Sequence, residues 1–149
     1  MTIFLRLLAL LLSTGIAVYS AQAEEISSSK NFGTYTVHYS TFNSLFVPAE
    51  IAQIHKLVRA KDQTLINIAV QKTADGEAVP ARITGSAKNL LQQVKTVDFK
   101  TIEEPGAIYY LGALRHTNEE VFHLDFAIVP EGESSPLQLR LTRKLYTEL

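Results

Sequence analysis

Histidine is the residue type that most readily binds metals and transfers protons near neutral pH, and this chain has four: His38, His55, His116 and His123. A zinc or copper site needs three or more such ligands to converge, and no two of these histidines have the helical four-residue spacing of a zinc motif. His123 and Asp125 lie two apart on a predicted strand, where the carboxylate can orient the imidazole. A metal-dependent or hydrolytic enzyme that uses His38, His123 and Asp125 is therefore one hypothesis, and separate solvated histidines are the simpler interpretation.

Other catalytic patterns are weaker. Gly85-Ser86 resembles part of a serine nucleophile elbow, but it lacks the second glycine and lies in a predicted strand. The chain has no cysteine nucleophile and no glycine-rich phosphate loop. The acidic pairs Glu103-Glu104 and Glu119-Glu120 fall in predicted turns, where solvated charge is the usual role. The sequence therefore predicts no catalytic residue, no cofactor and no metal ligand.

The first 23 residues have the pattern of a secretory signal peptide. Arg6 provides the positive region, Leu7 to Ala17 the apolar region, and Ala21-Gln22-Ala23 the small-residue pattern before cleavage. An uncleaved membrane anchor needs about 20 continuous apolar residues, and polar residues interrupt this stretch. We therefore expect cleavage before Glu24 and a periplasmic or secreted product without a stable membrane anchor.

Composition limits what the chain can use for stability and binding. Its 149 residues include 15 acidic and 14 basic ones and no cysteine, which excludes disulfides and thiolate metal sites. The net charge of −1, without long runs of one sign, gives no electrostatic footprint for nucleic acid or anionic lipid. We expect a flexible leader over residues 24–31 and a single domain over residues 32–149.

The elements of that domain are read from hydrophobic periodicity. The spacing of Ile51, Ile54, His55 and Val58 predicts one short amphipathic helix over residues 48–58. Alternating or β-branched segments predict about seven strands, at residues 32–42, 64–72, 81–88, 94–102, 107–115, 121–129 and 137–146. We expect the second and third of these to form a hairpin. The pattern predicts an antiparallel immunoglobulin-like β-sandwich, with a small barrel as the alternative.

The last two strands carry the clearest register. Matching inward residues across the loop at residues 130–136 places Phe126 opposite Leu139, and Asp125 opposite Arg140 on the outer face. Four residues of this hairpin should face the core: Phe122, Leu124, Leu139 and Leu141.

Sequence segments spread over most of the expected domain carry a resemblance to a known family. They are FGTYTVHYSTFNSLFVPAEIA from Phe32 to Ala52, NLLQQVKTVDFKTIEEPGAIYY from Asn89 to Tyr110, and NEEVFHLDFAIVP from Asn118 to Pro130. The chain resembles a proteobacterial family described only as domain of unknown function 4426. The resemblance implies a small exported envelope protein of Gram-negative bacteria, and brings no reaction, cofactor or catalytic residue with it.

The aromatic residues near the first strand are the best candidates for a binding site. The loop over residues 43–47 carries large apolar side chains, which either contact a partner or, in the case of Phe46, plug the end of the sandwich. The resemblance points to the same segment, so the candidate binding residues are Tyr39, Phe42, Asn43, Leu45 and Phe46. The leading hypothesis is a non-enzymatic module that contacts an envelope protein. Carriage of a small ligand in a cavity lined by Tyr109 and Leu111 is a third possibility.

Overall fold

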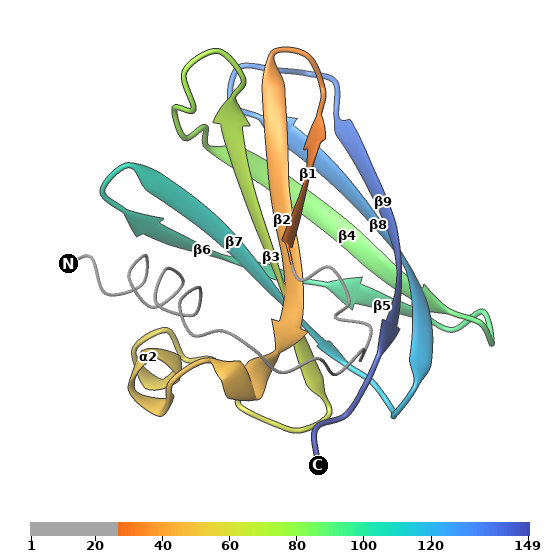
Figure 1. Ribbon diagram of the computed structural model, residues 1–149. Coiled ribbons are helices and arrows are strands. Elements are labelled where there is room, and N and C mark those ends of the chain that lie inside the picture. Colours follow the sequence, from red (N-terminus) through yellow and green to blue (C-terminus); the bar gives the residue numbers. More distant parts are fainter. Residues whose placement is uncertain (1–26) are drawn as a thin grey trace, which may run out of the picture.

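The computed structural model describes residues 27–149, which form two antiparallel sheets packed face to face (Figure 1). The predicted signal peptide lies outside the described residues. The elements are β1 (Ser27–Asn31), β2 (Tyr35–Asn43), the 3-10 helix η2 (Ser44–Phe46), α2 (Ala49–Ile54), β3 (Gln63–Lys72), β4 (Ala81–Asn89), β5 (Val94–Val97), β6 (Phe99–Glu104), β7 (Ala107–Arg115), β8 (Glu120–Pro130) and β9 (Leu137–Leu145).

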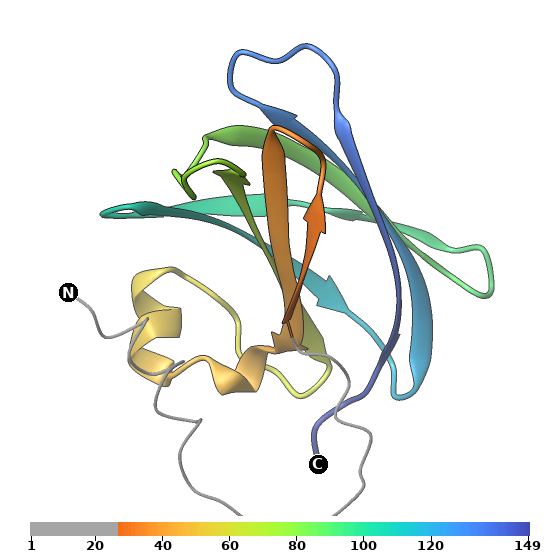
Figure 2. The same cartoon turned by 45° about the horizontal axis from the view of Figure 1, so that its top comes forward.

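The prediction of an antiparallel β-sandwich is confirmed. One sheet has the strand order β1-β2-β3-β7-β6 and the other β5-β4-β8-β9, and Figure 2 shows the two layers with α2 below the first sheet. The main core lies between them and contains Val37, Ile68, Phe122, Phe126 and Leu139, each fully or almost fully buried. Alternation of apolar and polar residues along each strand thus directs one face of each sheet inward.

Residues 27–149 form nine strands where about seven were predicted. One additional strand is β1, which pairs with β2 along its whole length although a flexible leader was expected over residues 24–31. Residues 24–26 lie outside the described residues. The other arises because the segment predicted as one strand over residues 94–102 divides at Asp98 into β5 and β6, which belong to different sheets.

The predicted hairpin between residues 64–72 and 81–88 is wrong. The turn at Asp75-Gly76 exists, with Gly76 at φ 73°, but pairing beyond it stops after a single bridge between Gln71 and Ala78. Pro80, which has no N–H to donate, follows, and β4 then joins the opposite sheet between β5 and β8. The connection therefore links the two layers of the sandwich.

The predicted helix is shorter than its sequence pattern suggests. It ends at Ile54, because Lys56 adopts a left-handed conformation with φ 53° and the backbone turns there. Ala52 is buried against Leu65 and Val47 in a small second core on the outer face of the first sheet. Ile54 and Val58, predicted on the buried stripe of a longer helix, are instead exposed.

The predicted register of the last hairpin is confirmed. Phe126 lies opposite Leu139, and Leu124 lies opposite Leu141. On the outer face, Arg140 Nε donates to Asp125 Oδ2 at 3.2 Å. This exposed ion pair contributes no more than about 1 kcal/mol to stability.

Candidate functional site

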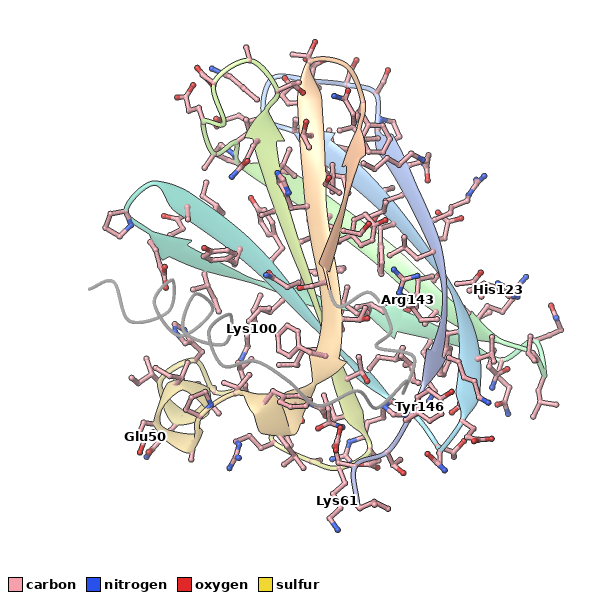
Figure 3. All side chains as sticks on the ribbon, viewed as in Figure 1. Glu50, Lys61, Lys100, His123, Arg143 and Tyr146 are labelled. Carbon is pink, nitrogen blue, oxygen red and sulfur yellow. The ribbon has the colours of Figure 1, made fainter. Side chains whose placement is uncertain are left out.

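The hypothesis of a site built from His38, His123 and Asp125 fails on geometry. His38 lies on the outer face of the first sheet, since its neighbour Val37 faces the core, whereas His123 lies on the outer face of the second sheet (Figure 3). His123 Nδ1 is 3.0 Å from Thr142 Oγ1, and Asp125 is paired with Arg140. Within residues 27–149, no group of three or more His, Asp and Glu side chains could hold a metal ion.

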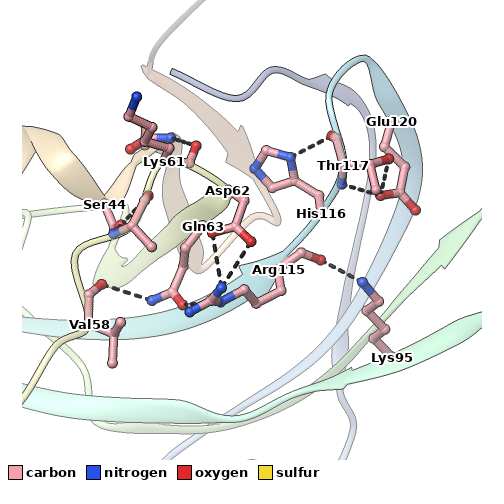
Figure 4. Close-up of polar contacts among 12 residues, drawn as sticks. Ser44, Val58, Lys61, Asp62, Gln63, Lys95, Arg115, His116, Thr117 and Glu120 are labelled. Carbon is pink, nitrogen blue, oxygen red and sulfur yellow. Dashed lines mark hydrogen bonds and ion pairs between the residues drawn. The ribbon is translucent and has the colours of Figure 1, made fainter. Parts of the chain in front are cut away.

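His116 has a structural role at one end of the sandwich. It is only 5% exposed, its Nε2 lies 2.9 Å from Thr64 Oγ1, and its Nδ1 lies 2.9 Å from the Thr117 carbonyl oxygen (Figure 4). Its backbone N–H donates to the Asp62 carbonyl at 3.0 Å. Both ring nitrogens are therefore engaged, which joins the end of β7 to the start of β3.

The remaining catalytic candidates also have structural explanations. Gly85 lies directly opposite Phe126 on the neighbouring strand β8, and a Cβ there would collide with the aromatic ring, so the glycine permits close packing rather than a nucleophile elbow. Glu104 lies near Tyr109, and burial of Tyr109 together with the Glu104 charge raises the pKa of that phenol. Tyr109 is half-buried on the outer face of the first sheet. Two surface hollows found among residues 27–149, one beside His123 and one beside Arg82, are lined by neither Tyr109 nor Leu111.

Glu120 is a structural carboxylate. Burial acts to raise its pKa, but hydrogen bonds from Asn89 Nδ2 and from the Thr117 backbone and hydroxyl, with the nearby Lys95 charge, outweigh it and lower the pKa below its ordinary value. The ionised form is therefore favoured in the folded state. Glu120 orders the turn before β8.

The five predicted binding residues occupy different environments. Tyr39 packs against the main core, and Phe42 packs under α2 in the second core. Asn43 is buried, Leu45 is half-buried, and Phe46 is 71% exposed. Of the two interpretations of Phe46, the structure therefore supports projection into solvent over plugging the sandwich end. Tyr39, Phe42 and Leu45 are partly buried, and Phe46 alone among the five is largely exposed.

Four hydrogen bonds made by the Asn43 and Ser44 side chains, which we call the clamp, hold the chain just before Phe46 in place. Asn43 Oδ1 accepts from the Leu45 N–H at 2.9 Å, and its Nδ2 donates to the Lys61 carbonyl at 2.8 Å. The Ser44 hydroxyl donates to the Ala60 carbonyl and accepts from the Ala60 N–H, at 3.0 and 2.9 Å. Because Asn43 and Ser44 are both buried, these hydrogen bonds are shielded from water and hold residues 43–45 against residues 60–61.

Further hydrogen bonds hold the residues that follow Phe46, up to the start of β3. Lys100 Nζ donates to the carbonyls of His55 and Lys56 at 3.0 and 2.9 Å, at the C-terminal end of α2 (Figure 3). Gln63 Nε2 donates to the Val58 carbonyl at 3.0 Å (Figure 4). Arg59 Nη2 donates to the Leu45 carbonyl at 3.2 Å. The segment from residue 43 to residue 61, which we call the α2 segment, is thus tied to the sheet at both ends and at its middle.

The α2 segment nevertheless exposes three large apolar side chains. Phe46 is 71%, Ile54 69% and Val58 55% exposed. Sequence reasoning identified Phe46 but placed Ile54 and Val58 on a buried helix face. The short apolar stripe of the helix could have corrected this prediction. Ile51 and Ala52 alone already make the contact between the helix and the sheet. Rigid anchoring with exposed apolar side chains is typical of a surface that contacts a partner.

Comparisons with known proteins agree with the resemblance found in the sequence. A family model described as domain of unknown function (DUF4426) matches residues 29–148. The chain is similar to the crystal structure of a DUF4426 family protein from Pseudomonas aeruginosa PAO1, with 29% identity, a TM-score of 0.75, and coverage of 84% of this chain and 98% of that one. The comparison with curated proteins gives no match.

The fold is also similar to that of FetP from uropathogenic Escherichia coli strain F11. A copper-bound variant of FetP shares 8% identity, with a TM-score of 0.60 and coverage of 83% of this chain and 97% of that one. FetP as isolated after expression in the periplasm of E. coli gives 8% identity and a TM-score of 0.58, with coverage of 82% and 95%. At this identity the likeness shows the fold alone. Among the described residues, no helix is long and apolar enough to span a membrane.

Proposed function

This chain belongs to the DUF4426 family, and we propose that it is a non-enzymatic binding or accessory module that contacts an envelope protein in the periplasm of Gram-negative bacteria. The observation that carries the proposal is the exposure of Phe46, Ile54 and Val58 on a segment that hydrogen bonds hold in place. The predicted signal peptide supports export to that compartment.

The energetic argument depends on rigidity. Exposed aromatic and aliphatic side chains gain about 25 cal/mol for each Å² of apolar surface that a partner removes from water. That gain is reduced when binding must also order a flexible loop. The clamp of Asn43 and Ser44 to residues 60–61 orders the α2 segment before any partner arrives, so little of this cost remains. Phe46, the largest exposed side chain of the segment, is the expected centre of the contact.

Capture of a partner tests the proposal. The bait is the exported form of the protein, whose N-terminus we expect at Glu24. The double variant Phe46→Ser and Ile54→Ser should reduce recovery of a specific envelope protein about tenfold or more, because both exposed side chains leave the contact. The free energy of unfolding should stay within about 0.5 kcal/mol of the native value, since neither side chain is in a core.

The matched control uses an exposed apolar residue outside the α2 segment. Tyr146→Ser removes a side chain that is 49% exposed near the C-terminal end. This control should leave capture unchanged. Equal recovery with the native chain and the double variant, at unchanged stability, would refute the α2 segment as the contact surface.

A further inference from the structure

The hairpin formed by β4 and β5 carries a second exposed apolar group, separate from the α2 segment. Its tip extends beyond the packed body of the sandwich (Figures 1 and 2). Leu90 is 63%, Leu91 79% and Val94 62% exposed. We call these three residues the hairpin tip.

The hairpin tip is held rigidly although its leucines face water. Asn89, only 3% exposed, accepts from the Leu91 and Gln93 N–H groups at 3.0 and 2.9 Å through Oδ1. Its Nδ2 donates to Gln93 Oε1 and Glu120 Oε1, at 2.8 and 2.9 Å. Gln92 takes a left-handed conformation with φ 65°, which closes the turn. The turn geometry therefore keeps the leucines outside the core.

The charge of this hairpin differs in sign from that of the chain. Residues 81–97 include Arg82, Lys88 and Lys95 and no acidic residue, although the whole chain has a net charge of −1. Lys88 is exposed, and Lys95 Nζ donates to the Arg115 carbonyl at 2.6 Å. Lys88 is thus the exposed lysine beside the tip, whereas the Lys95 side chain turns toward the body of the sandwich, with its ammonium over the Phe122 ring. Two acidic groups lie close by and are engaged, Asp125 with Arg140 and Glu120 with Asn89 and Thr117.

We propose that the hairpin tip inserts into the surface of a phospholipid membrane with anionic headgroups. Aliphatic side chains at the end of a narrow projection can enter the interface without moving the body of the protein, and binding grows with buried apolar area and with attraction to anionic lipid. Lys88, exposed on the strand that leads into the tip, lies where a basic side chain contacts headgroups. A protein contact is less favoured here, because the tip has no aromatic or arginine side chain of the kind that dominates such interfaces.

A single tryptophan reports insertion, because the native chain has none. We place it at the tip with Leu91→Trp and, as a matched control, on the α2 segment with Phe46→Trp. Both exported proteins are titrated with vesicles of phosphatidylcholine alone and of phosphatidylcholine mixed with phosphatidylglycerol. The emission of the Leu91→Trp variant should shift to shorter wavelength with the anionic vesicles, and that of the Phe46→Trp variant should not. No shift with Leu91→Trp, or the same shift in both variants, would overturn the proposal.

Vesicle binding by variants of the tip gives a second readout. Leu90→Ser with Leu91→Ser should lower the partition coefficient for anionic vesicles about tenfold or more, since two leucines lose their burial in lipid. Lys88→Gln should weaken binding several-fold at low salt, and Lys61→Gln, an exposed lysine outside the hairpin, should have no effect. Unchanged binding by the double leucine variant would contradict the proposal. A shift of the tip reporter that requires an added protein rather than vesicles would assign the hairpin to a protein partner instead.

Discussion

At the scale of single residues, His116 and Glu120 stabilise local structure. His116 and Glu120 are each held by several hydrogen bonds at one end of the sandwich. The sequence correctly paired Asp125 with Arg140, because strand alternation fixes which side chains share a face. It could not reveal that His38 and His123 lie on opposite outer faces, since that depends on which strands meet in which sheet.

Glu120 should make the stability of the protein depend on acidic pH. Its pKa is lowered in the folded state, so its carboxylate stabilises the fold above the ordinary value of 4.5, and this contribution is lost as the pH falls through the lowered pKa. We expect Glu120→Gln to be less stable than the native chain at neutral pH and to lose less stability on acidification below pH 4.5. Denaturant unfolding as a function of pH measures both.

The hydroxyl of Thr117 provides a graded version of the same test. Thr117→Val removes one of the donors to Glu120 and should produce a smaller change in the same direction. A Glu120→Gln profile that falls as steeply in acid as the native one would show that this carboxylate does not contribute to the pH dependence.

At the scale of elements, regular strands were predictable and their interruptions were not. Clean alternation identified β8 and β9 with their register. The end of α2 and the division of the strand over residues 94–102 occur at single positions, Lys56 and Asp98, where the sequence has neither the proline nor the glycine that usually marks such a break. The same limit applies to the binding site, because the exposure of Ile54 and Val58 follows from where the helix ends.

The clamp of the α2 segment can be tested by hydrogen exchange. Ser44→Ala removes two buried hydrogen bonds to Ala60 and should accelerate exchange of amides in residues 45–60 about tenfold, with little effect on β8 and β9. Thr36→Ala removes a side-chain hydrogen bond to Thr73 outside the segment and should leave these amides unaffected. Unchanged exchange in the Ser44 variant would show that other contacts hold the segment.

At the scale of the whole molecule, apolar burial between two sheets supplies the stability of a chain without disulfides. The sandwich class followed from the number and alternation of the strands. The composition, however, gave only the net charge, whereas the pairing of β4 with β5 places Arg82, Lys88 and Lys95 on one hairpin whose tip projects from the sandwich (Figure 1). The α2 segment and the hairpin tip are thus two separate exposed apolar surfaces on one rigid body.

The core itself should be sensitive at Phe126. This side chain is fully buried, and its ring meets Phe99 edge-on at 5.5 Å between centroids. Phe126→Ala should lower the free energy of unfolding by about 3–5 kcal/mol through lost burial and a cavity. Val129→Ala, on the outer face of the same strand, should cost less than about 1 kcal/mol. Denaturant unfolding of both variants checks this contrast, and similar losses in the two would contradict the assignment of the core.

The most direct test of the central claim is site-specific photo-cross-linking in cells that export the protein. A photoreactive amino acid at position 46 should form one discrete adduct with an envelope protein, because Phe46 is the expected centre of the contact. The same group at position 84, where Thr84 is exposed on the opposite sheet, should form none. Absence of a protein adduct at position 46, or the same adducts at both positions, would contradict the assignment of the α2 segment as a partner-binding surface.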